Sequence, residues 1–128
     1  MNGLYQSADW KSEKHAPVIE APGAAKRGEA VLVKVLVGKE IAHPNTTAHH
    51  IAWMEVYFHP DGEKFPQMLG RFDFCAHGAG ADGPDSSTVY TEPHGEVAFK
   101  TEKPGKILAA SYCNIHGLWE SEVPLRLE

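Results

Sequence analysis

The feature that most restricts the fold of this chain is a two-residue alternation of apolar side chains, with no sustained helical period. It is clearest at residues 31–37, where valine takes every second position. The same alternation recurs in four later segments: 52–58, 70–74, 96–100 and 119–127. Residues 107–112 are apolar or small on both faces. Because strand side chains point alternately to two faces, these segments predict strands, with 107–112 in the middle of a sheet.

Turn-forming residues separate the predicted strands. Pro60-Asp61-Gly62 and Pro104-Gly105 combine a fixed φ with a permissive glycine, so each predicts a hairpin. The stretch from His77 to Ser87 is rich in Gly, Ala, Asp and Ser and predicts a long loop. Six or seven short strands with such turns indicate an all-β protein, an immunoglobulin-like antiparallel β-sandwich of about seven strands.

The length of 128 residues favours one domain, residues 1–128, since chains of this size seldom form two cores. Its first 28 residues contain Pro17, Pro22, Gly23 and Gly28 and are interpreted as an extended N-terminal arm. The net charge of −5, with no basic run beyond Lys26-Arg27, argues against nucleic acid or an anionic membrane as partner. No apolar run suits a membrane span and no secretory signal is recognisable, so a cytoplasmic location is expected.

Two cysteines are too few for a disulfide-dense secreted scaffold, whereas eight histidines are many for this length. The strongest local signal is the segment from Tyr112 to Gly117, which contains Cys113 and His116 three positions apart at a strand end. These two side chains can bind one metal ion if the backbone turns between them, and Gly117 permits such a turn. A buried, purely structural cysteine is the alternative for this segment.

A second cluster of histidines lies in the segment from His43 to His50. Its proline and two threonines disfavour a helix, so we expect a loop that folds back and brings His43 and His49 to one point. His49 and His50 are adjacent and begin a strand, so only one of them should reach a given site. The alternative is a polar surface loop with incidental histidines.

A third segment, Glu13-Lys14-His15, lies in the arm and by itself is a solvated charged stretch. Together, however, the three segments resemble the superoxide reductase family, which comprises neelaredoxins and the iron domain of desulfoferrodoxins. The matching motifs are Glu13-Lys14-His15 with Pro17-Val18-Ile19, His43-Pro44-Asn45-Thr46-Thr47 with His49-His50-Ile51, and Ser111 to Trp119. No Cys-x2-Cys pair precedes Cys75, so the chain is similar to the one-iron class, which lacks the extra rubredoxin-like iron module.

The resemblance implies a mononuclear iron centre that cycles between Fe(II) and Fe(III). Its implied ligands are four histidines in a plane and one axial thiolate: His15, His43, His49, His116 and Cys113. Glu13 is implied as a sixth ligand of Fe(III), and Lys14 as a positive charge that attracts superoxide. One charge at about 8 Å in an effective dielectric near 20 is worth about 2 kcal/mol before salt screening.

The implied activity is the one-electron reduction of superoxide to hydrogen peroxide. An external donor of rubredoxin type then re-reduces the iron, and one-iron relatives suggest a homotetramer. The remaining histidines, at positions 50, 59, 77 and 94, are assigned structural or surface roles, and Cys75 is a packed strand residue or a surface thiol.

Two other functions stay open from the residues alone. A blue-copper electron-transfer protein also has a β-sandwich, but its weak axial methionine usually follows the cysteine, and the last methionine here is Met68. A structural zinc module would prefer four tetrahedral ligands to five candidates.

Overall fold

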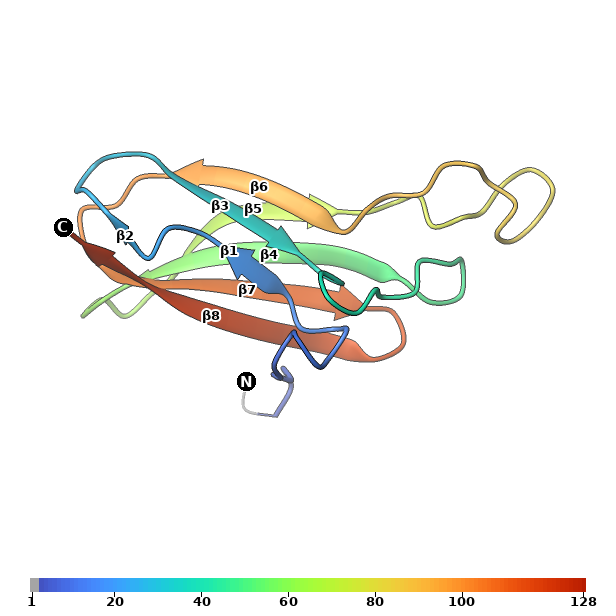
Figure 1. The fold of residues 1–128 in the computed structure, drawn as a ribbon, viewed down its shortest axis with the longest axis horizontal. Helices are drawn as coiled ribbons and strands as arrows, with labels where there is room; N and C mark the ends of the chain where they lie inside the picture. Colours follow the sequence, from blue (N-terminus) through green and yellow to red (C-terminus); the bar gives the residue numbers. More distant parts are fainter. Residues whose placement is uncertain (1–2) are drawn as a thin grey trace.

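The computed structural model describes residues 3–128, which form eight strands in two facing layers (Figure 1). The strands are β1 (Val18–Glu20), β2 (Ala24–Ala25), β3 (Val31–Leu36), β4 (Ile51–Pro60), β5 (Gln67–Asp73), β6 (His94–Phe99), β7 (Gly105–Cys113) and β8 (Gly117–Leu127). One sheet has the order β1-β3-β6 and the other the order β2-β8-β7-β4-β5. All pairings are antiparallel except the short parallel contact of β2 with β8. The predicted β-sandwich is therefore confirmed.

The core lies between the two sheets and is built from the alternating positions of the sequence. Val31, Val33 and Val35 of β3 are buried, and across the core so are Met54 and Val56 of β4. Each such side chain contributes about 1.5–3 kcal/mol when it leaves water. The predicted central strand is β7, which pairs with β4 on one edge and β8 on the other.

Three details differ from the sequence predictions. Pro104-Gly105 does not close a hairpin, because β6 and β7 lie in different sheets and the turn carries the chain across the sandwich. In β4 the buried position is Ile51 and not Ala52, because the register shifts between Ile51 and Trp53. The arm is also less extended than expected, since it bends at residues 14–16.

The N-terminal arm is attached to both sheets. Gln6 forms an isolated parallel bridge with Trp119 of β8, while β1 pairs with the edge of β3. The six segments predicted as strands correspond to β3 to β8, and the short strands β1 and β2 bring the number to eight, close to the expected seven. Between Gln6 and β1 the chain forms a loop, residues 7–17.

The loops that carry the candidate site gather at one end of the sandwich. In Figure 1 the segment after β3, the hairpin turn between β7 and β8, and the long yellow loop between β5 and β6 all lie at the right-hand end. The long loop covers residues 74–93, and so confirms the loop predicted at 77–87. Within residues 3–128, no helix has the length and apolar content needed to cross a membrane.

Candidate metal centre

The sulfur of the candidate site is held by a tight hairpin. Cys113 is the last residue of β7, pairs with Gly117 of β8, and is fully buried. Gly117 has φ 80°, the left-handed conformation that a three-residue hairpin turn requires and that glycine adopts without strain. The turn returns His116 to the sulfur, so that its backbone N–H donates to Cys113 Sγ at 3.3 Å. The predicted turn at Gly117 is confirmed.

The loop between β3 and β4 folds back on itself, as predicted. Thr46 and His49 exchange two backbone hydrogen bonds, from N–H to C=O at 2.9 and 3.3 Å. Asn114, next to Cys113, donates to the carbonyl of Ala48 at 2.9 Å and thereby joins this loop to the hairpin. His49 points toward Cys113 and His116, whereas His50 turns away and stacks on His77 with ring centroids 3.6 Å apart.

The arm contributes His15, which is buried although it lies in a bent segment. Its carbonyl accepts a hydrogen bond from the buried hydroxyl of Ser111 on β7 at 3.1 Å. Its ring stacks on Trp119 at a centroid distance of 5.0 Å and an interplanar angle of 13°. These contacts attach the arm to the sheet that carries Cys113.

Glu13 lies on the far side of the His15 ring from the other histidines. Its carboxylate accepts from His15 Nδ1 at 2.6 Å and from the backbone N–H groups of His15 and Ala16 at 2.7 and 3.1 Å. Burial would raise the pKa of Glu13, but the hydrogen bonds from His15 and Ala16 outweigh it and lower the pKa. In this structure Glu13 is therefore an ionised partner of His15, because the arm bends between them.

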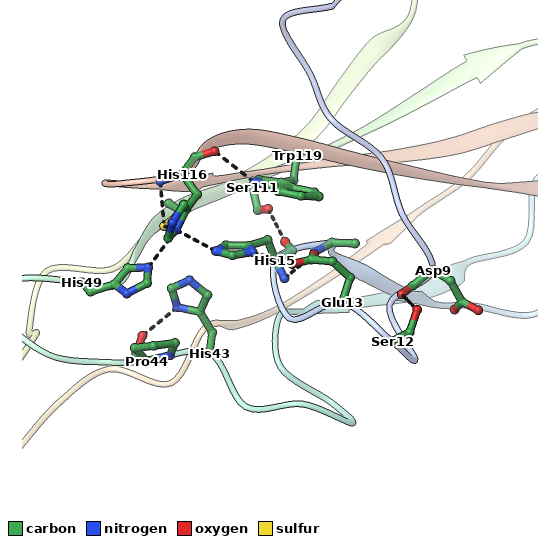
Figure 2. A network of polar contacts seen from close by, with 12 residues as sticks. Asp9, Ser12, Glu13, His15, His43, Pro44, His49, Ser111, His116 and Trp119 are labelled. Carbon is green, nitrogen blue, oxygen red and sulfur yellow. Dashed lines mark hydrogen bonds and ion pairs between the residues drawn. The ribbon is translucent and has the colours of Figure 1, made fainter.

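Four imidazole rings form the corners of a near-square (Figure 2). Neighbouring ring centroids are 4.7–5.0 Å apart, whereas His15 and His49, across one diagonal, are 6.2 Å apart. The corners, in order around the square, are His15, His43, His49 and His116. Ligand atoms of His15, His43, His49 and Cys113 all lie within 4.8 Å of one another.

His116 belongs to the same cluster through its Nδ1 atom. This nitrogen lies 3.0 Å from His15 Nε2, 3.2 Å from His49 Nε2 and 3.8 Å from Cys113 Sγ. One ring nitrogen has either one hydrogen or one lone pair, so it cannot satisfy three such neighbours by hydrogen bonds. Nitrogens bound to one ion at about 2.1 Å with bonds at right angles lie about 3 Å apart, so these distances fit a shared metal.

The outward-facing nitrogens of two rings fix which nitrogen is free for a metal. The ionised Glu13 and the carbonyl of Pro44 can only accept, so His15 Nδ1 and His43 Nδ1 both carry hydrogen; the His43 bond is 2.7 Å long. Their Nε2 atoms then present lone pairs to the cluster. Among the described residues, His43 Nε2 is a buried nitrogen without a hydrogen-bond partner. Such hydrogen bonds are typical supports of metal-binding histidines.

The electrostatics favour the neutral, metal-binding form of two of the rings, those of His43 and His49. Burial lowers the pKa of His43 to about 4, against the hydrogen bond to Pro44 and with help from neighbouring positive charges. Burial, followed by the charges of His116 and His15, lowers the pKa of His49. The Lys14 ammonium contributes to both shifts, so its positive charge acts on the site.

Sequence reasoning missed the residues that hold the ligands in place. Trp119 contacts two of them, because its Nε1–H donates to the carbonyl of His116 at 3.2 Å while its ring stacks on His15. Ser111 donates to His15 in the arm. Asn114 donates to Ala48 in the loop between β3 and β4, which contains His43 and His49 and is called the ligand loop. All three belong to the segment from Ser111 to Trp119 that the family resemblance had singled out, but no pattern indicated what they contact.

The remaining histidines and Cys75 lie outside the square. His59 Nε2 bonds the carbonyl of Glu63 at 2.8 Å, His94 is exposed near Glu96, and His77 Nε2 donates to the carbonyl of Phe74 at 2.6 Å. Cys75 is an exposed free thiol beyond the end of β5. Of the two interpretations of Cys75, the surface thiol is the one observed.

Comparisons with a family model, with known sequences and with solved structures agree with one another. The desulfoferrodoxin family model matches residues 7–122. The chain is 58% identical to a superoxide reductase of Pyrococcus furiosus, over 94% of each chain, and 48% identical to neelaredoxin of Megalodesulfovibrio gigas, over 100% of this chain and 98% of that protein. The structure of the reduced superoxide reductase (neelaredoxin) of Archaeoglobus fulgidus superposes with a TM-score of 0.89 at 60% identity, and covers 97% of this chain and 99% of that one.

Proposed function

Because this chain belongs to the desulfoferrodoxin family, which includes superoxide reductases and neelaredoxins, we propose that it is a superoxide reductase with one iron site. In the proposed reaction superoxide gains one electron and two protons and becomes hydrogen peroxide. The observation that carries the proposal is the near-square of four imidazoles beside a buried cysteine sulfur. Residues 1–128 act as one domain, and its arm supplies a ligand.

The proposed ligands are His15, His43, His49 and His116 through one ring nitrogen each, and Cys113 through sulfur. Imidazole and thiolate together suit iron, copper and zinc, and five donors exceed the four that zinc prefers. Iron, when bound, would supply a one-electron couple, and the thiolate would increase the electron density on the metal. The hydrogen bond from His116 N–H to Cys113 Sγ would moderate this effect.

The surrounding residues would guide an anionic substrate to the site despite the net charge of −5. Lys14 is partly exposed and its charge acts at His43 and His49, so it would attract superoxide. Cys113 is fully buried whereas His116 is exposed, so the cluster has one side in the core and one that solvent reaches.

Glu13 has two proposed positions. In the one observed here, its carboxylate accepts hydrogen bonds from His15 Nδ1 and from the backbone N–H groups of His15 and Ala16. In the other, its carboxylate would bind Fe(III), since a hard oxygen donor prefers the ferric to the ferrous ion. The exchange would break three hydrogen bonds, so ferric binding has a cost that the ferrous form avoids.

Two further proposals concern partners. An external one-electron donor of rubredoxin type would restore the ferrous state, and the chain would form a homotetramer. Stopped-flow oxidation of a reduced rubredoxin by the ferric protein tests the first, and light scattering of the eluting protein tests the second.

The central test combines metal analysis, an optical spectrum and product stoichiometry. We expect one iron per chain, a thiolate-to-Fe(III) absorption band after oxidation, and hydrogen peroxide without oxygen release when the ferrous protein meets superoxide. An intense blue copper spectrum would instead support the electron-transfer alternative. A colourless zinc protein without reductase activity would support the structural module.

A further inference from the structure

The long loop between β5 and β6, residues 74–93, contributes none of the proposed ligands but contacts the ligand loop repeatedly. Asn45 Nδ2 donates to the carbonyl of Thr91 at 2.8 Å. The rings of His50 and His77 stack almost parallel, at an interplanar angle of 6°. The most extensive contact joins Thr47, which lies between the proposed ligands His43 and His49, to Asp85 of the long loop.

Thr47 and Asp85 form a reciprocal set of hydrogen bonds. The Asp85 carboxylate accepts from the backbone N–H of Thr47 at 2.8 Å and lies 3.0 Å from its hydroxyl. In the other direction, the backbone N–H of Asp85 donates to the Thr47 hydroxyl at 3.2 Å. Because both main chains take part, the contact fixes the position of the backbone as well as that of the side chains.

The conformation of Asp85 is unusual. It has φ 57° and is the non-glycine residue with a positive φ among residues 3–128. This conformation is disfavoured for a side chain with a Cβ, although aspartate tolerates it better than most residues. In this conformation the Asp85 carboxylate reaches Thr47, and these hydrogen bonds offset the energetic cost of the positive φ.

Asp85 is the long-loop residue that binds the main chain in the middle of the ligand loop, since the other contact of Thr47 with the long loop is made by its hydroxyl, 3.4 Å from the carbonyl of His77. The backbone bonds between Thr46 and His49 tie the loop to itself. Asn114 holds its end, at Ala48 and His50. Thr47 is the point at which the long loop fixes the backbone midway between the two ligands.

We propose that Asp85 is a positioning residue that pre-forms the His43–His49 loop for metal binding, so that the long loop is a brace for the metal centre. The inference rests on the proposed metal site and says how part of it is held. Outer residues that orient metal ligands typically change metal affinity by 10–100-fold when they are lost.

The test compares Asp85→Gly, Asp85→Asn and Asp82→Ala. Glycine adopts the positive φ without strain and removes the whole side chain, carboxylate included. Asparagine keeps an acceptor oxygen, and Asp82 is an exposed charge on the same loop that serves as a matched control. Amide hydrogen exchange of residues 46–49 is measured in the metal-free protein. Release of Fe(II) to a chelator, the ferric spectrum and denaturant unfolding are measured as well.

We expect Asp85→Gly to speed exchange at residues 46–49, to raise the rate of Fe(II) release about tenfold, and to broaden the ferric band. Asp85→Asn should restore most of each property, and Asp82→Ala should match the wild type. Thr47→Val should add little to Asp85→Gly in the double variant, since without Asp85 the hydroxyl keeps only its longer contact with the His77 carbonyl. The unfolding midpoint should change little, because the contact is at the surface.

Wild-type exchange and iron release in Asp85→Gly would overturn the proposal, as would an equal effect of Asp82→Ala. Failure of the wild-type protein to bind iron would refute the proposed function instead. The exchange experiment on metal-free protein distinguishes these outcomes, because it needs no bound iron.

Discussion

The hairpin at residues 113–117 and the arm loop at residues 7–17 both supply proposed ligands to one cluster, but the fold holds them by different means. Main-chain pairing fixes the hairpin, where Cys113 pairs with Ile51 on one side and Gly117 on the other. Side-chain contacts hold the arm near its ligand, through Ser111, Glu13 and Trp119 around His15. The sheet therefore fixes the sulfur, whereas the position of His15 depends on contacts with side chains far away in the sequence, those of Ser111 and Trp119.

The largest expected effect comes from the hairpin. Cys113→Ser should abolish the thiolate-to-Fe(III) band and most of the reductase activity, because a hydroxyl is a far poorer ligand than a thiolate. The sandwich should still fold, since serine is similar in size, and circular dichroism checks this. A variant that keeps the band and the activity would show that Cys113 is not a ligand, and the hairpin would then not be the fixed part of the centre.

A smaller effect is expected from the charge on the arm. Lys14→Ala should slow the second-order reaction with superoxide roughly tenfold, and the remaining rate should depend less on ionic strength. Stopped-flow or pulse-radiolysis kinetics at several salt concentrations measure both. Lys11→Ala, a nearby exposed lysine of the same arm, is the control. Equal rates for wild type and Lys14→Ala at low salt would indicate that the metal charge suffices.

The anchor between arm and sheet predicts a moderate change in stability. Ser111→Ala removes the hydroxyl that donates to the His15 carbonyl in a buried place, which should cost about 1 kcal/mol in the free energy of unfolding. Iron release to a chelator should also become faster, because His15 loses an attachment. Denaturant titration and chelator kinetics measure the two effects. Unchanged iron release would mean that Trp119 and Glu13 hold His15 without Ser111.

The smallest effect on the reaction with superoxide is expected from Glu13. Glu13→Ala should change the second-order rate less than Lys14→Ala does, because the ferrous form is the one that reacts. It should shift the ferric absorption band and let azide bind Fe(III) more readily. Glu13→Gln separates the charge from the hydrogen bonds, since its amide oxygen can still accept from His15. Loss of iron in Glu13→Ala but not in Glu13→Gln would make the bond to His15 the main role of Glu13.

Features set within one segment of the chain could be predicted from the sequence, whereas features set by a distant strand could not. Strands β3 to β8 were predictable because each is long enough to show alternation or, in β7, a run that is apolar or small on both faces, whereas β1 and β2, with three and two residues, show no period. The hairpin predicted at Pro104-Gly105 was wrong, because turn chemistry does not say whether the next strand returns to the same sheet. The shift at Ile51 comes from a bulge, which depends on the partner strand.

The candidate site divides in the same way. Cys113 and His116 are three residues apart, and His43 and His49 six, so local turns bring each pair together and spacing could indicate them. His15 lies about a hundred residues from His116, and only the family resemblance pointed to it. The bend that turns Glu13 onto His15 Nδ1 depends on the backbone of Ala16 and on the fold, so the interpretation of these residues as an extended arm could not indicate this contact.

The attachment of the arm at Gln6 and at β1 has a consequence for how the centre would respond to loss of a ligand bond. A ligand on a free tail would diffuse away once its bond broke, whereas residues 7–17 are closed at both ends and confine His15 to a small volume. Its effective concentration at the site therefore stays high, and rebinding is an intramolecular event. In the proposed iron centre His15 could then detach and return without release of the ion, so the centre would exchange a ligand and remain assembled.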